Sequence, residues 1–212
     1  MSTIKVNTIE NRNGSNINIG KSGTTVGFVA GTTVDFSTNS PTISGLTASD
    51  VSGVATVNGI TEADQWRLTT SFQGDANPLS SNLERVDTGG WGQLGTGMSV
   101  SSGIFTFPST GIWLVKFRVT NNHNGENRYT TAAIQVTTNN SSYAPIASGE
   151  QGIQSSSGNV YSNTLVETLI DCTNTSNVKV RFNIDVEDAS TYTNGETDVS
   201  NTNMMFIRLG DT

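Results

Sequence analysis

The segment that most constrains the fold of this chain spans residues 103–117 and reads GIFTFPSTGIWLVKF. Ile104–Phe107 is a short run of β-favouring residues, and Pro108–Gly111 interrupts it with residues that favour turns. A second extended run, Ile112–Asn121, follows directly. The segment therefore predicts two strands joined by a short turn.

In the second run the side chains alternate between two faces, because strand side chains repeat every two residues. Lys116 and Arg118 lie on the outer face, and Ile112 and Leu114 make that face partly apolar. We therefore expect a half-buried antiparallel strand whose outer side, at Ile112 and Leu114, contacts a neighbouring chain or sheet. The residues of the inner, apolar face are Trp113, Val115, Phe117 and Val119.

The same segment resembles the central hairpin of the trimeric jelly rolls related to tumour necrosis factor and to the globular heads of complement. In that family a glycine followed by an aromatic or aliphatic strand fills the middle of the sandwich, and Gly111, Ile112, Trp113 and Phe117 occupy that pattern here. The resemblance covers residues 66–212. It implies a jelly-roll head and a homotrimer.

The resemblance also implies that the last strand, Met204–Leu209, lies centrally in the inner sheet near the three-fold contact. Met204 and Phe206, with Ile112 and Leu114, are then expected at the trimer interface, and Met204, Met205 and Phe206 help to fill the core. Arg208 needs a carboxylate or carbonyl partner, because a buried charge without one is costly.

The pattern from Trp66 onward predicts an all-β fold without a long helix, an antiparallel sandwich or jelly roll. Two long loops, Asn139–Asn159 and Glu187–Asn203, separate the later strands, and a short helical turn is expected at Thr61–Asp64, within a junction at residues 61–65. The predicted strands are Trp66–Phe72, Asn82–Asp87, Met98–Val100, Ile104–Phe107, Ile112–Asn121, Tyr129–Thr138, Tyr161–Cys172, Val178–Val186 and Met204–Leu209.

Residues 1–60 have a different sequence pattern from the rest of the chain. They contain short apolar doublets that begin at residues 17, 26, 34 and 43. Such short repeats cannot close a core alone and usually stack, so they predict a thin β shaft shared among three chains. A flexible linker rich in Thr, Gly and Asn is the alternative. Only 33% of the chain is hydrophobic, which also favours burial between copies.

The net charge of −7, with 11 scattered basic residues, argues against nucleic acid and against anionic lipid as partners. No apolar run approaches the roughly 18 residues that a membrane-spanning helix needs, so membrane insertion is not expected. Cys172, the single cysteine, is expected to be a small buried residue, without a disulfide.

Few residues qualify as a catalytic or metal site, and we expect no enzyme and no cofactor. The single histidine, His123, is expected to be a solvated loop residue, and Gly89–Gly97 a glycine-rich loop that lacks the lysine of a phosphate loop. Asp185, Glu187 and Asp188 form an acidic cluster that can be a Ca²⁺ site or a solvated rim. Three aromatic residues in predicted loops are receptor-contact candidates, or else pack against the sandwich edge: Trp91, Tyr143 and Tyr192.

The first residues, MSTIKVNTI, resemble the N-terminal stretch of structural proteins from phages of marine bacteria. A shaft followed by a jelly-roll head is the layout of bacteriophage fibres. The resemblance implies a chain on the virion exterior, anchored to other virion proteins through Ile4, Val6 and Ile9, whose head binds a bacterial surface glycan or protein. The alternatives are a purely structural capsid decoration, head fibre or tail-collar protein, and a bacterial jelly-roll adhesin.

Overall fold

The structure is a computed structural model, and it describes residues 59–212. Most of the predicted shaft, residues 1–58, lies outside the described residues. So do the predicted anchor residues Ile4, Val6 and Ile9.

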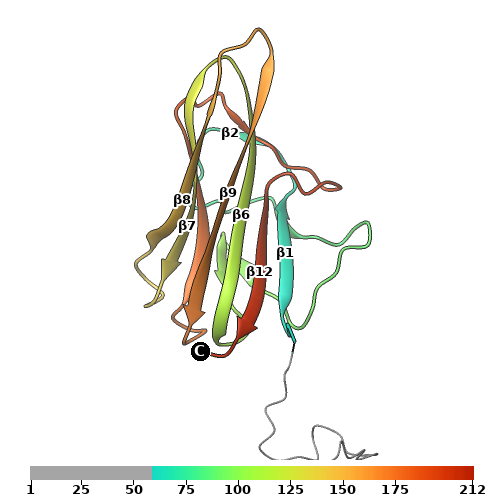
Figure 1. Cartoon of the computed structure of the whole chain (residues 1–212), viewed down its shortest axis with the longest axis vertical. Coiled ribbons are helices and arrows are strands. Elements are labelled where there is room, and N and C mark those ends of the chain that lie inside the picture. Colours follow the sequence, from blue (N-terminus) through green and yellow to red (C-terminus); the bar gives the residue numbers. More distant parts are fainter. Residues whose placement is uncertain (1–58) are drawn as a thin grey trace, which may run out of the picture. The chain divides into compact units, whose positions relative to one another are not determined.

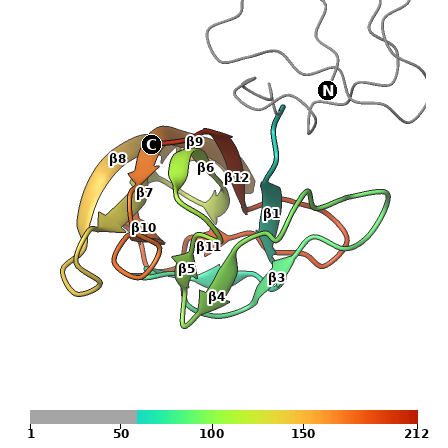
Figure 2. The ribbon, with the colours of Figure 1, turned by 90° about the horizontal axis from the view of Figure 1, so that it is seen from below.

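The described part of the chain is all-β and contains twelve strands. They form two antiparallel sheets that face each other as two layers (Figures 1 and 2). No helix in residues 59–212 has the length and apolar character needed to cross a membrane. The strands are β1 (Ala63–Leu68), β2 (Phe72–Gln73), β3 (Leu83–Arg85), β4 (Ser99–Ser101), β5 (Ile104–Thr106), β6 (Gly111–Asn124), β7 (Asn127–Thr137), β8 (Ala144–Ile153), β9 (Asn159–Cys172), β10 (Lys179–Val186), β11 (Tyr192–Thr193) and β12 (Asn203–Gly210).

The first sheet is built around β6, which pairs with β9 along its whole length and with β12 on its other side. β12 pairs in turn with β1, and β1 with β3. Beyond the start of β12, β11 takes its place beside Asn121 and Asn122, and β2 pairs with β11. The second sheet has the order β4-β5-β10-β7-β8.

The core between the sheets follows the alternation predicted for residues 112–119. Trp113, Val115, Phe117 and Val119 are fully buried, and they meet Phe105 and Phe182 of the second sheet within one apolar cluster. Cys172 is buried in the same cluster, as predicted, and burial raises the pKa of its thiol.

Three sequence predictions need correction. The helical turn expected at Thr61–Asp64 is wrong, because β1 begins at Ala63 and its backbone pairs with β12 and β3. The predicted loop Asn139–Asn159 contains β8, the edge strand of the second sheet. The predicted loop Glu187–Asn203 contains β11, which pairs with β6 beyond the start of β12.

The two ends of the sandwich differ in what they carry. The C-terminus and the start of β1 lie at one end, and the turns between β6 and β7 and between β8 and β9 lie at the other (Figure 1). We call this second end the distal end.

Candidate functional site

The outer side of the first sheet is covered by no layer of residues 59–212, and we call it the outward face. It is formed on β6 by Ile112, Leu114, Lys116 and Arg118, on β9 by Leu165, Glu167 and Leu169, and on β12 by Met205 and Ile207. Leu165 and Leu169 are 61% and 59% exposed. The prediction that Ile112 and Leu114 lie on an outer, partly apolar face is consistent with their partial exposure.

Pairing across the strands gathers the apolar residues of the outward face into one row. Leu114 lies opposite Leu169 on one side and Ile207 on the other, and Ile207 lies opposite Ala63 of β1. The next row is polar at its centre, where Lys116 and Glu167 form an ion pair of 2.8 Å. The face thus has an apolar band beside a charged pair, as a protein–protein contact often does.

Met204 and Phe206 do not belong to this face. Both are fully buried between the two sheets, and they belong to the core of the chain itself. This part of the predicted interface is corrected, because their side chains have no surface left for a second chain. Met205 and Ile207 alternate with them along β12 and lie on the outward face instead.

A loop at residues 86–98 approaches the outward face and places Trp91 beside it. A pocket of about 280 Å³ opens there, lined among others by Trp91, Lys116, Arg118, Leu165 and Met205. Trp91 is 46% exposed, so it remains a receptor-contact candidate. Arg118 has no carboxylate partner among residues 59–212, and its guanidinium reaches only Asn163, at 3.4 Å.

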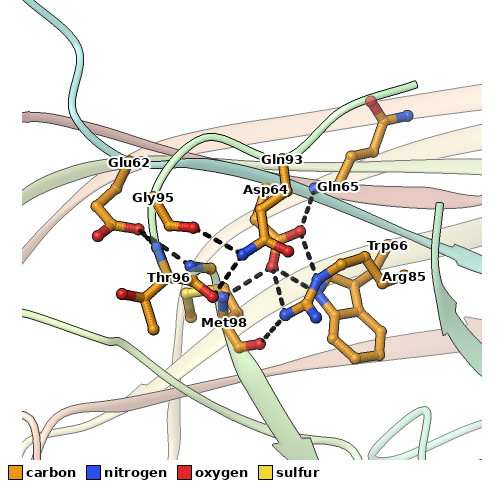
Figure 3. Close-up of polar contacts among 10 residues, drawn as sticks. Glu62, Asp64, Gln65, Trp66, Arg85, Gln93, Gly95, Thr96 and Met98 are labelled. Atoms are coloured by element: carbon orange, nitrogen blue, oxygen red, sulfur yellow. Dashed lines mark hydrogen bonds and ion pairs between the residues drawn. The ribbon is translucent and has the colours of Figure 1, made fainter. Parts of the chain in front are cut away.

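This loop is held by two carboxylates, Asp64 of β1 and Glu62 just before it (Figure 3). Asp64, 3% exposed, accepts hydrogen bonds from the indole Nε1 of Trp66 at 2.9 Å, from the backbone N–H of Met98 at 2.7 Å and from Nε of Arg85 at 3.0 Å. Glu62 accepts from the N–H groups of Thr96 and Gly97 at 2.8 and 3.0 Å. The loop is therefore held by charge-assisted hydrogen bonds.

The glycines of this loop serve the same attachment. Gly97 has φ of +72°, and a Cβ there would lie 2.8 Å from a carboxylate oxygen of Asp64. Gly95 has φ of +74° and would collide with Glu62. Both positions combine a left-handed backbone with a close approach, for which glycine is suited. The expectation that Gly89–Gly97 is a structural loop is thereby supported.

The other two aromatic candidates lie on different elements. Tyr143 precedes β8 and stacks under the guanidinium of Arg181, 4.3 Å from the ring centre, on the second sheet. Burial raises the pKa of its hydroxyl, against the opposing effect of Arg181. Tyr192 is 43% exposed on β11. The structure does not bring Trp91, Tyr143 and Tyr192 together into one site.

Two of the three candidate calcium ligands have separate partners. Glu187 pairs with the backbone N–H and guanidinium of Arg128, and Asp188 accepts from the backbone N–H and hydroxyl of Ser190. No group of three or more His, Cys, Asp or Glu side chains within residues 59–212 is arranged to hold a metal ion. Asp185, Glu187 and Asp188 therefore do not form such a group.

His123 is not a solvated loop residue. It lies within β6, is 6% exposed, and its Nδ1 lies 3.3 Å from the hydroxyl of Thr191. Its Nε2 lies 3.7 Å from a carboxylate oxygen of Asp188. Arg208 does have the partners predicted for it, donating to the carbonyl of Thr110 at 2.9 Å and pairing with Asp211.

Asp185 provides a prediction of pH dependence. Burial and the neighbouring Asp75 carboxylate raise its pKa above the ordinary 3.8. A carboxyl group with a raised folded-state pKa weakens the fold above that pKa, and the penalty disappears as the pH falls through it. We expect Asp185→Asn to melt at a higher temperature than the wild type at pH 7, and at the same temperature below pH 3.8.

Glu187→Gln is the matched control, for which we expect the opposite change in melting temperature. The backbone N–H of Arg128 lowers the pKa of Glu187 from its ordinary 4.5, so its charge stabilises the fold above that value. The variant should melt below the wild type at pH 7, and the difference should vanish as the pH falls from 4.5 through the lowered pKa. Parallel thermal melts across pH 2.5–7 measure the change in melting temperature of each variant. If both variants melt above the wild type at pH 7, or both below it, the opposite roles of the two carboxylates are contradicted.

Comparison with known proteins supports the fold. No protein-family model matches the sequence, and no curated protein matches it. Among solved structures, murine APRIL at pH 5.0 superposes with a TM-score of 0.51 at 11% identity, over 70% of this chain and 98% of that one. Murine APRIL at pH 8.5 gives a TM-score of 0.49 at 10% identity, over the same shares.

The described part of this chain is a jelly roll of the tumour necrosis factor type. The antiparallel two-sheet architecture and the superposition on murine APRIL confirm the fold predicted from residues 103–117. At this level of identity the likeness concerns the fold alone.

Proposed function

We propose that this chain is a subunit of a homotrimeric bacteriophage fibre on the exterior of the virion. Residues 1–60 attach it to other virion proteins and form the shaft, and the jelly-roll head binds the bacterial surface. The resemblance of residues 1–9 to phage structural proteins supports the virion attachment. The arrangement of the head, with its distal end turned away from the start of β1, supports an outward-facing role (Figure 1).

The outward face is the observation that supports the proposed homotrimer. Leu165 and Leu169 stand more than half exposed beside Leu114 and Ile207 on a regular sheet face, and no segment within residues 59–212 lies over them. A contiguous apolar patch of this kind favours a partner. A second and third copy of this chain fit, because the low hydrophobic content limits the core that one chain can form alone.

The trimer is tested by placing a charge in the apolar row. We expect Leu169→Lys to convert a trimer into a folded monomer, because the ammonium would be buried without a partner at each subunit contact. Leu169 is 59% exposed in the single chain, so the substitution leaves the core intact. Native mass spectrometry or light scattering measures the assembly, and circular dichroism the fold.

Tyr129→Lys is the control for that substitution. Tyr129 lies on β7 of the second sheet and is 38% exposed. It should remain trimeric. A stable folded monomer of the wild-type chain would contradict the trimer, and a trimeric Leu169→Lys variant would move the contact away from the outward face.

The receptor role is tested by competition. We expect purified full-length chain to bind host cells and to lower phage adsorption in proportion to its concentration, because it occupies the same surface sites. If the intact trimer neither binds cells nor competes, the chain contacts only virion proteins. Electron microscopy of antibody-labelled particles then locates it on capsid or tail.

A further inference from the structure

Four side chains form a single row across the distal part of the first sheet. Tyr161 of β9 lies opposite Asn122 of β6, Asn122 lies opposite Tyr192 of β11, and Tyr192 lies opposite Gln73 of β2. Residues directly opposite in antiparallel strands project from the same face. The row therefore presents two tyrosines with an asparagine between them.

Burial confirms which side of the sheet the row is on. The neighbouring row, Ser162, Asn121 and Thr193, is buried, and the Asn121 amide donates to the Thr193 hydroxyl at 3.0 Å inside the sandwich. Successive residues of a strand point to opposite faces, so the tyrosine row points outward. Tyr161 and Tyr192 are 63% and 43% exposed.

The chemistry of the row combines flat apolar faces with an amide. The tyrosines stand two strands apart, roughly 10 Å. Asn122 lies between them and is 9% exposed. An exposed aromatic ring offers a flat apolar surface with a polar edge. An amide offers two donors and an acceptor, a set that matches vicinal hydroxyl groups.

The charge of the row selects among ligands. None of its four side chains is charged, and Arg118, which shares the outer side of β6, lies four residues away, roughly 13 Å. The chain carries a net charge of −7, which disfavours anionic ligands. A neutral sugar, with an apolar ring face and several hydroxyls, suits both the aromatic faces and the amide.

We propose that Tyr161, Asn122 and Tyr192 form a binding site for a neutral hexose of a surface glycan. This inference rests on the proposed function, and it names the class of receptor. The rings stack on the sugar, and Asn122 hydrogen-bonds its hydroxyls. The row lies towards the distal end, and three copies in a fibre would strengthen a weak single-site contact through avidity.

The test uses the full-length chain and two kinds of probe. Binding is measured to immobilised dextran, mannan and galactan, and adsorption to host cells is measured separately. We expect binding to at least one neutral polysaccharide, reduced about tenfold by Tyr161→Ala and by Tyr192→Ala. Tyr161→Phe should retain most of the binding, because the ring is kept. Tyr129→Ala, an exposed tyrosine outside the row, should bind like the wild type.

Three results would overturn the site. One is wild-type binding to none of the three polysaccharides, and another is undiminished binding by both alanine variants. The third is loss of the trimer in Tyr161→Ala, which would make the row a subunit contact. Cell adsorption separates this failure from that of the proposed function: wild-type adsorption that the alanine variants retain rejects the sugar site and leaves the fibre role standing.

Discussion

Replacing Asp64 by alanine is expected to lower the free energy of unfolding by about 3–5 kcal/mol. The carboxylate is 3% exposed and accepts from Trp66, Arg85 and Met98, as well as from the backbone of Gln65. Its removal leaves several donors unpaired, including a guanidinium, and each unpaired buried group carries a desolvation penalty. It also removes one of the two carboxylates that hold the loop carrying Trp91.

The measurement is urea unfolding at equal protein concentrations, since an oligomer's stability depends on concentration. Asp211→Ala is the matched control: Asp211 also pairs with an arginine, but its side chain is 93% exposed. We expect that control to stay within about 0.5 kcal/mol of the wild type. A similar loss in both variants would show that burial of the Asp64 carboxylate contributes little.

The strands that could be predicted are those with apolar alternation. In β6, four inward residues from Trp113 to Val119 are fully buried, as period-two patterning indicated. The sequence does not predict β8, because it is an edge strand with little inward surface. Its sequence, APIASGEQGI, offers no alternation, and Pro145, Gly149 and Gly152 are typical of a loop.

The polar attachments could not be predicted, because they join residues far apart in sequence. Asp64 contacts Met98 across 34 positions, and His123 meets Thr191 across 68. β6 continues to Asn124, beyond its apolar residues, because its inward Asn121 and His123 find hydroxyl partners on the segment around β11. Local patterning carries no signal for such pairs.

The tyrosine row is another group of residues, here a candidate binding site, that local sequence patterning does not reveal. The sequence alone makes Tyr192 a candidate, as an aromatic residue in a predicted loop. Tyr161 and Asn122 join it only through the register of three strands. Sequence can indicate that an aromatic residue is exposed, but the pairing of strands decides which exposed residues share a surface.

The largest core effect is expected at Phe182. Its ring lies 4.8 Å from that of Phe117, 5.5 Å from that of Phe105 and 6.0 Å from that of Phe206, centre to centre. Phe182 and Phe105 belong to one sheet, and Phe117 and Phe206 to the other, so this cluster joins the two layers. The side chain is fully buried.

We expect Phe182→Ala to lower the free energy of unfolding by about 3–5 kcal/mol, through lost burial and the cavity left between the sheets. Phe182→Leu, which fills most of that space, should lose about 1–1.5 kcal/mol. Urea unfolding with unchanged m-values would measure both changes as differences in midpoint. Phe182→Ala could instead lower the free energy of unfolding no more than Phe182→Leu does. That result would show that the three remaining phenylalanines close over the gap and that contacts elsewhere hold the two sheets together.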